Sequence, residues 1–382
     1  MYSNTSSVNI VKRGHLFLKN PKESIPNTDG IYSMTIHVFD QLVSPDELKN
    51  AIKGINVSNL VNLCIEMNSA NDVLRVILEV YPTLANQFEN IWGKNMSYSS
   101  VVYRPLNCTS FKVFSDYEFP SVTKIEFDCL PDTPLTGLPN TVVCLRDVVV
   151  NKNRCETIFN QMKRIKFLKS NVRYMPTCEW ICFSRCMFDD FDEEHEQNDW
   201  INEVTKTIKF EKCEGILPSI RFESLTSMYI DEHDYHEFSL NNCRFPNIDE
   251  CVLNNYKSFN TWNISCVKRL SIRGDVPNMV EFDNLESLSL YIKSVDILSG
   301  TNEMSNIKTK DLLIEIIDDE EWHHYYNARD LAYLNTSKLK SVSIIGASMV
   351  GDIEPLKIKF EEAGVESCTI TFAVTQDILK KD

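Results

Sequence analysis

The chain has 382 residues, roughly two to three times the length of a usual domain, which predicts two domains or one elongated array of repeats. Hydrophobic residues make up 43% and charged residues 24%, a composition typical of a folded protein rather than a disordered one. Asp and Glu number 54 against 39 Lys and Arg, and the formal charge of −15 excludes a basic surface for nucleic acid over the whole molecule.

The N-terminal residues, Met1 to Val11, are polar and lack the apolar core of a secretory signal peptide. No stretch reaches the roughly 18 consecutive apolar residues that a membrane-spanning helix needs. The 13 cysteines are odd in number and follow no small disulfide-scaffold spacing, so we expect reduced thiols. These features predict a cytoplasmic or nuclear protein that does not contact a membrane.

The N-terminal part combines a strand-like segment, residues 34–38, with helical segments. Ser44 followed by Pro45, Asp46 and Glu47 is a helix start, with a capping hydroxyl, proline at the first helical position and acids in the first turn. Residues 70–81 carry apolar side chains at helical spacing before Pro82. We predict that residues 1–118 form an N-terminal cap and the first repeats.

From residue 122 onward the motif apolar-x-x-apolar-x-apolar recurs. Clear copies begin at Val122, Met162, Leu225, Ile248, Val267, Leu285 and Leu339. Weaker copies begin at Asn140, Cys178, Thr205 and Val365, and one consists of Ile314 with Ile316. The middle residues lie about 16 to 28 apart, with a mean of about 22, and leucine-rich repeats have periods of roughly 20–29 residues.

A further copy of the spacing occurs at Leu60, Leu63 and Ile65. A second signal lies three positions after the last apolar residue of this copy and of two others, where Asn68, Cys186 and Cys213 stand. A short Asn or Cys side chain inside a turn can hydrogen-bond backbone groups that would otherwise be unpaired. On these residues the chain resembles the leucine-rich repeat family over residues 33–372. The resemblance implies an α/β repeat: a solenoid with a parallel sheet on its concave face and irregular loops with few helices on its convex face.

The repeats are expected over residues 119–352, and residues 353–382 should form a terminal cap. Within this cap, residues 353–363 predict a helix that Gly364 ends, and a last strand follows.

Three groups of side chains could suggest metal binding, but each has a simpler interpretation. Cys178, Cys182 and Cys186 have no standard zinc spacing, and on an extended segment their separations of four would place them on one face. His233 and His236 belong to an acidic loop after a strand. The histidine pair at 323–324 stands among aromatic residues, which suggests a surface that contacts another protein. We therefore predict no metal site.

No catalytic motif is present: there is no nucleophile elbow, no paired Cys/His signature, no Walker loop and no dinucleotide fingerprint. The low count of 11 glycines agrees with this, because phosphate loops are rich in glycine. We expect no enzymatic activity, no catalytic residues and no cofactor. Two acidic runs, 189–199 and 318–321, are either solvated loops or docking sites for a basic partner.

The best candidate site follows from strand alternation, because residues beside the buried apolar positions must point away from the core. On the concave face these outward positions are rich in basic and aromatic residues: Lys166, Trp180, Lys209, Tyr229, Arg269, Arg273 and Tyr291. Arg, Trp and Tyr dominate the energetics of protein interfaces. We predict that this stripe binds another protein through an acidic segment, and we do not expect nucleic acid as the partner.

The expected function is therefore a non-enzymatic scaffold or adaptor, with an oligomeric state that the sequence leaves open. The irregular repeats are similar to those of intracellular proteins, including F-box substrate receptors of SCF-type ubiquitin ligases. Residues 72–82 are vaguely like an F-box but lack its leading Leu-Pro, so a substrate receptor remains the alternative. A subunit of a nucleic-acid-associated assembly is a further alternative, and its binding would weaken steeply with salt.

Overall fold

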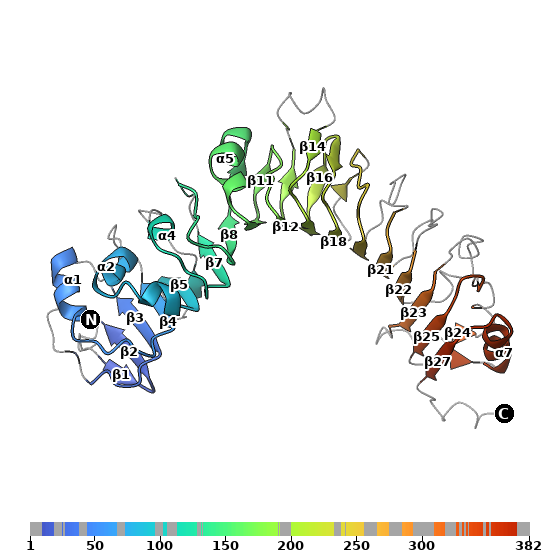
Figure 1. Ribbon diagram of the computed structural model, residues 1–382, viewed down its shortest axis with the longest axis horizontal. Helices are drawn as coiled ribbons and strands as arrows, with labels where there is room; N and C mark the ends of the chain where they lie inside the picture. The colour runs from blue at the N-terminus through green and yellow to red at the C-terminus, as the bar shows by residue number, and fades with distance from the viewer. Residues whose placement is uncertain are drawn as a thin grey trace, which may run out of the picture. The chain divides into compact units, whose positions relative to one another are not determined.

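The computed structural model describes residues 10–18, 25, 27–37, 44–66, 73–95, 102–104, 113–127, 131, 133–189, 191, 200–232, 238–240, 242–255, 266–274, 285–292, 309–317, 326–327, 331, 334, 336–346, 349–350 and 353–372. It is an α/β protein with many parallel strands and few helices (Figure 1). The chain forms two compact units, Met1–Ile181 and Cys182–Asp382. Among the described residues, no helix is long and apolar enough to cross a bilayer.

The first unit begins with a sheet of six strands. These are β1 (Ile10–Lys12), β2 (His15–Leu18), β3 (Ser33–His37), β4 (Asn62–Glu66), β5 (Asn90–Asn95) and β6 (Val102–Arg104). Strands β2 to β5 are parallel, whereas β1 and β6 pair antiparallel at the two edges. The predicted strand at 34–38 is confirmed as β3.

A parallel sheet of twelve strands follows, and each strand pairs with the next one of this sheet along the chain. In chain order the strands are β7 (Lys124–Phe127), β8 (Val142–Arg146), β10 (Arg164–Leu168), β12 (Trp180–Ser184), β15 (Thr207–Glu211), β18 (Ser227–Asp231), β20 (Glu250–Asn254), β21 (Arg269–Arg273), β22 (Ser287–Ile292), β23 (Asp311–Ile316), β25 (Ser341–Gly346) and β27 (Ser367–Phe372). Such an order is typical of stacked coils that bury apolar side chains between neighbours.

Each of the twelve motif copies predicted from residue 122 onward coincides with one of these strands, so the predicted parallel sheet is confirmed. One copy was placed wrongly. In β23, Leu312 rather than Ile314 pairs with Leu288, so the copy starts at Thr309. Thr309 is buried and its hydroxyl donates to the carbonyl oxygen of Glu286 at 3.0 Å. A threonine at the first motif position concealed the copy.

The turns after the main strands share one backbone conformation. The residue that follows the strand has a positive φ in several coils: Asp147, Lys169, Arg185, Lys212, Asn255 and Gly274. Its N–H donates to the carbonyl oxygen of the last residue of the next strand in Lys212 to Asp231 at 2.6 Å and in Asn255 to Arg273 at 2.7 Å. The backbone ladder therefore continues past the strand ends and joins successive coils.

Cysteine thiols lie inside these turns, as the sequence predicts. The thiol of Cys186 donates to the carbonyl oxygen of Ser184 at 3.5 Å, and the thiol of Cys213 donates to that of Phe183 at 3.4 Å. The third predicted position, Asn68, lies outside the described residues. The buried thiols thus have backbone acceptors within the coils.

Beyond the turns, the predicted irregular loops are in part ordered into short strands. They are β9 (Val149–Val150), β11 (Asn171–Val172), β13 (Met187–Phe188), β16 (Glu214–Ile216) and β19 (Phe238–Ser239), with two pairs formed by β14 (Trp200–Asn202) and β17 (Ile220–Phe222) and by β24 (Tyr326–Asn327) and β26 (Met349–Val350). Strands of two or three residues are too short to show a period, which explains why the sequence did not predict them. Gly215 is required there, since a Cβ would lie 2.1 Å from the carbonyl oxygen of Phe188.

The helices are short. They are α1 (Pro45–Ile52), α2 (Val73–Val80), α3 (Leu84–Gln87), α4 (Val113–Asp116), α5 (Lys152–Thr157), the 3-10 helix η1 (Phe159–Gln161) and α7 (Glu354–Glu362). The predicted start of α1 is confirmed: the Ser44 hydroxyl accepts from the N–H of Glu47, whose carboxylate accepts from the N–H of Ser44. Helices α2 and α7 are confirmed too, and Gly364 follows α7 with a φ of +74°.

The core of the second unit contains a cluster of phenylalanines. Phe183 lies 5.1 Å from Phe188 and 5.7 Å from Phe210, and Phe210 lies 4.8 Å from Phe238, measured between ring centres. Each of these side chains is buried. The cluster joins main strands β12 and β15 to short strands β13 and β19, and so holds the two sides of the coils together.

Candidate functional site

The seven side chains predicted to form the binding stripe all belong to strands of the twelve-stranded sheet. Each is half-buried or exposed and alternates with buried neighbours, so the predicted outward orientation agrees with the strand pattern. Lys166 and Trp180 belong to the first unit, and the other five belong to the second. The two groups are therefore considered separately.

In the first unit the outward side chains form pairs of their own. The guanidinium carbon of Arg164 lies 5.4 Å from the ring centre of Trp180, a cation–π contact. Lys166 pairs in register with Cys144, which in turn pairs with Glu126. Cys144 is only 3% exposed although it lies on the outward side, and burial raises the pKa of its thiol. The longer side chains around Cys144 therefore shield its thiol from solvent.

In the second unit, Tyr229 is the best-positioned predicted residue. The ammonium nitrogen of Lys209 lies 5.4 Å from its ring centre, and Asn254 Nδ2 donates a 2.8 Å hydrogen bond to its phenolic oxygen. Burial, followed by the charge of Asp231, raises the pKa of the phenol. The ring is half-buried and held by neighbours on both adjacent strands, so it lies ready as an aromatic contact.

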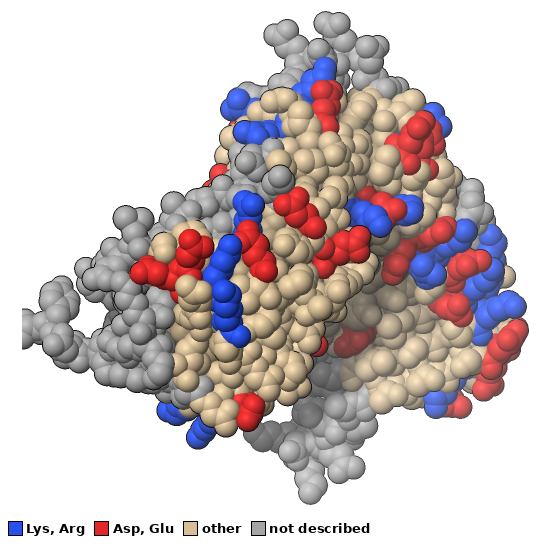
Figure 2. All heavy atoms as spheres, turned by 60° about the vertical axis from the view of Figure 1, so that its left-hand side comes forward, with Lys and Arg blue, Asp and Glu red and all other residues tan. Residues whose placement is uncertain are grey.

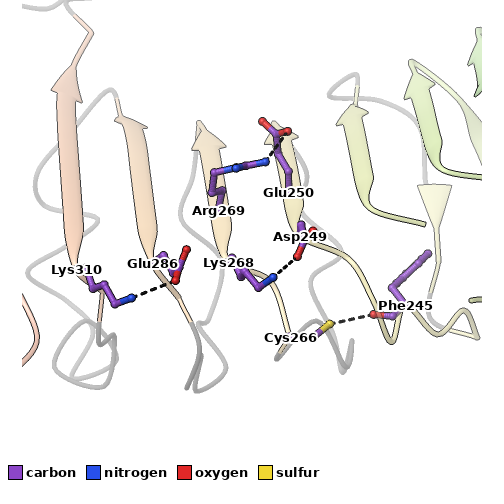
Figure 3. Close-up of polar contacts among 8 residues, drawn as sticks. All are labelled: Phe245, Asp249, Glu250, Cys266, Lys268, Arg269, Glu286 and Lys310. Atoms are coloured by element: carbon purple, nitrogen blue, oxygen red, sulfur yellow. Dashed lines mark hydrogen bonds and ion pairs between the residues drawn. The ribbon is translucent and has the colours of Figure 1, made fainter. Parts of the chain in front are cut away.

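The other predicted residues of this unit lie further along the same face. Arg269 Nη2 is 3.6 Å from Glu250 Oε2 on the neighbouring strand, and both side chains are largely exposed, so this ion pair is weak. Figure 3 shows these two side chains turned toward each other across β20 and β21. Arg273 pairs in register with Asn254 on one side and Tyr291 on the other.

The strand register corrects the predicted charge of this face. From β15 to β23 the outward bases are Lys209, Arg269 and Arg273, and the same face carries five acids: Glu211, Asp231, Glu250, Asp311 and Glu315. The sequence-based stripe left out most of these acids because it was chosen for basic and aromatic residues. On the side of the molecule that Figure 2 brings forward, basic and acidic side chains also lie among one another. A purely acidic partner segment therefore lacks the expected basic counterpart in the second unit.

The register also reveals a difference in side-chain size. The middle outward row contains Val252, Ser271 and Ser289 on consecutive strands, and these are short side chains. The rows on either side carry long ones, with Glu250 and Arg269 before the row and Arg273 and Tyr291 after it. Neighbouring strands lie about 4.8 Å apart, so these short side chains follow one another closely across the sheet. They form a shallow row between two rows of longer side chains.

A second charged row lies just before the strands and was not predicted. Lys268 Nζ is 2.7 Å from Asp249 Oδ1, and Lys310 Nζ is 3.1 Å from Glu286 Oε1, as Figure 3 shows. The hydrogen bond to Lys268 lowers the pKa of Asp249, and the same bond raises the pKa of Lys268. The signal in the sequence was the second residue of each motif copy, directly after its first apolar residue, but the motif leaves that position unspecified.

A pocket of about 380 Å³ lies beside this row. Its walls come from Asp249, Lys268, Glu286, Cys266 and residues 246–248. The thiol of Cys266 donates to the carbonyl oxygen of Phe245 at 3.1 Å (Figure 3). The charged side chains of the lining are paired, Lys268 with Asp249 and Glu286 with Lys310.

The three cysteines considered as metal ligands do not share one strand face, so that expectation is wrong. Only Cys182 lies within β12, and Arg185, with a φ of +54°, turns the chain before Cys186. All three are buried, and burial raises the pKa of Cys178. No group of three possible metal ligands occurs within the described part of the chain.

Two other predicted groups fall largely outside the described residues. Within the acidic run 189–199, only Asp189 and Phe191 are described, and the run 318–321 is not described. The histidines at 233, 236, 323 and 324 also lie outside the described residues.

Comparison with known proteins adds no relative. No protein-family model, no curated protein and no solved structure matches the chain.

Proposed function

We propose that the chain is a non-enzymatic recognition protein that binds another protein through the outward side chains of β15 to β22 in its second unit. One observation carries the proposal: Tyr229 is held between Lys209 and the hydrogen-bonded Asn254 on adjacent strands. An aromatic side chain that is already oriented loses little conformational entropy on binding, and this favours affinity. Tyrosine and arginine are also the residues that most often dominate interface energies.

The partner that suits this face is an extended segment of mixed charge. It would follow the row of Val252, Ser271 and Ser289, whose short side chains leave room for its backbone. Its own charges would meet the acids and bases of the flanking rows, including Asp231 and Arg273. Interleaved charges favour one register of the segment over others, because a shifted register places like charges side by side.

We further propose that the coils are leucine-rich repeats and that this face is the concave one. The support is the one main strand per coil and the thiols of Cys186 and Cys213 within the turns. Deleting residues 208–227 tests this, because the deletion joins Thr207 to Met228, the equivalent of Ile208 one coil later. We expect the chain to unfold cooperatively after this deletion, because it removes one whole coil. After deletion of residues 208–217, which removes part of a coil, we expect no cooperative unfolding transition.

Binding is tested by capture of partners from a native lysate with the full chain. We expect the variant Tyr229→Ala/Arg273→Ala to lose partners at least tenfold relative to the wild type, while a cooperative melting transition shows that the variant is folded. The matched control is Arg244→Ala, an exposed arginine of the short outer β-bridge with Arg221. Equal capture by all three proteins would contradict the proposal.

The alternatives give different outcomes in the same experiment. Loss of partners after nuclease treatment, with a steep salt dependence, would indicate a nucleic-acid-associated assembly. Retention of an Skp1-type adaptor by the double variant, alongside loss of other partners, would indicate a substrate receptor.

A further inference from the structure

Strand β27 is the last strand of the twelve-stranded sheet, and it pairs with β25 on one side alone. Among the described residues, no strand pairs with its other edge. The N–H and C=O groups along such an edge are a template for a further strand. Figure 1 shows β27 beside β25, with α7 at the same end of the second unit.

The core side of this strand is open, unlike that of the other strands. In β25 the inward residues Val342 and Ile344 are 2% and 0% exposed. Their partners in register are Cys368 and Ile370, of which the first is exposed and the second half-buried. Ile358 of α7 is 46% exposed. In the earlier coils the corresponding apolar side chains are covered by the next coil, whereas none of the described residues forms a coil over Cys368 and Ile370.

Helix α7 lies near the open side chains. Burial raises the pKa of the Cys368 thiol, and the charges of Lys357 and Glu361 act on it as well. Ile358 follows Lys357 directly in the same helix. The open end is thus bounded by the edge of β27 and by the charged end of α7.

The charges at this end are mainly acidic. Glu366, immediately before β27, occupies the place that Lys268 and Lys310 hold in earlier coils, where each pairs with the acid directly before the neighbouring strand. On the side of β25, the N–H of Glu366 donates to the carbonyl oxygen of Lys340, the residue in the same place before that strand. Glu361 and Glu362 at the end of α7 are exposed. If a further strand paired with the free edge of β27, the residue directly before it would lie beside Glu366. The negative charge of Glu366 would favour Lys or Arg at that position.

We propose that the free edge of β27 binds an extended segment of another protein, which adds as a parallel strand with a Lys or Arg beside Glu366 and apolar residues over Cys368 and Ile370. Only an extended segment can pair with the backbone groups of the edge and cover both side chains at once. The basic residue at its start sets the parallel direction.

Strand β25, which pairs with the other edge of β27, already has this order of residues. Residues 340–345, with the sequence Lys-Ser-Val-Ser-Ile-Ile, place a lysine before two inward apolar residues. A fluorescein-labelled peptide of this sequence is therefore the probe. The control peptide replaces its valine and the first isoleucine by glutamate.

Fluorescence anisotropy with the full chain measures binding. We expect saturable binding of the probe and at least tenfold weaker binding of the control peptide. Ile370→Glu should weaken binding at least tenfold, whereas Thr369→Glu, on the other face of the same strand, should change it less than threefold. The rate of Cys368 alkylation should fall when the probe is bound, because the added strand covers this thiol.

The melting temperatures of both variants establish that each is folded. Absence of saturable binding to the wild-type chain would overturn the proposal. Equal loss in Ile370→Glu and Thr369→Glu would do so too, because only the first lies on the open side. Concentration-dependent self-association that Ile370→Glu abolishes would show that a second copy, not another protein, occupies the edge.

Discussion

The side-chain amide of Asn254 donates a 2.8 Å hydrogen bond to the phenolic oxygen of Tyr229 on the neighbouring strand. Because Lys209 lies 5.4 Å from the centre of the same ring, residues of three adjacent strands fix one aromatic side chain. This arrangement can be tested without knowledge of the partner.

Replacing Asn254 with alanine should raise the pKa of Tyr229 further, because the hydrogen bond from Asn254 lowers a pKa that burial raises. The raised pKa means that Tyr229 contributes stability below its unfolded-state pKa, and this contribution is lost as the pH rises through the folded-state value. An ultraviolet titration of the tyrosines, compared with that of Tyr229→Phe, identifies the shifted group. An unchanged pKa in Asn254→Ala would contradict the role given to the hydrogen bond.

Replacing Lys268 with methionine should raise the pKa of Asp249 toward its ordinary value, since the hydrogen bond to Lys268 is the main cause of its lowering. The lowered pKa makes the pair stabilising above the unfolded-state pKa of Asp249, and this contribution disappears as the pH falls through the folded-state value. Carbon-13 NMR of the Asp249 carboxylate measures the shift. Lys310→Met, which removes the equivalent ion pair to Glu286, is the matched control and should leave Asp249 unchanged.

Replacing Gly215 with alanine should destabilise the chain by at least about 2 kcal/mol, because φ is +98° and the new Cβ would meet the carbonyl oxygen of Phe188. Gly54→Ala is the control, since a Cβ at Gly54 meets nothing within 4 Å. Denaturant unfolding measures both. A loss of stability at Gly54 as large as that at Gly215 would show that the contact with Phe188 is not the cause.

The cysteines should differ sharply in reactivity toward iodoacetamide. Cys178 and Cys251 are buried, and burial raises the pKa of both thiols, while that of Cys243 rises to about 12. Only the thiolate reacts, so these residues should stay unmodified in the folded chain at pH 8, whereas Cys368, the exposed thiol among the described cysteines, should react faster than they do. Mass spectrometry of tryptic peptides follows each site over time. Early modification of Cys251 would contradict its burial.

The main strands could be predicted from the sequence because each coil repeats the same apolar spacing, and the inward residues of β21, Leu270 and Ile272, show it without interruption. The copy in β23 was misplaced because Thr309, a buried polar residue, stands where an apolar one was expected. The phenylalanine cluster around Phe210 depends on contacts between strands and short outer segments, which no local period encodes.

The candidate site was predicted in part. Outward orientation follows from alternation, so Tyr229 and Arg273 could be placed on one face before the structure was known. The side chains that contact Arg269 and Tyr229 come from other strands, and only the register brings Glu250 beside Arg269 or Asn254 beside Tyr229. The open end at β27 could not be predicted, because its sequence matches that of strands whose inward residues are covered.

The left-handed residues that end the coils have a consequence for the engineering of this molecule. Arg185 and Lys212 each hold a φ of +54° at positions where Gly274 fills the same role in a later coil. A long side chain in this conformation costs about 1–2 kcal/mol relative to glycine or asparagine. Since coils of such an array depend mainly on their immediate neighbours, gains at separate turns should add. Thermal tolerance can therefore be raised turn by turn, without touching either face that is available to a partner.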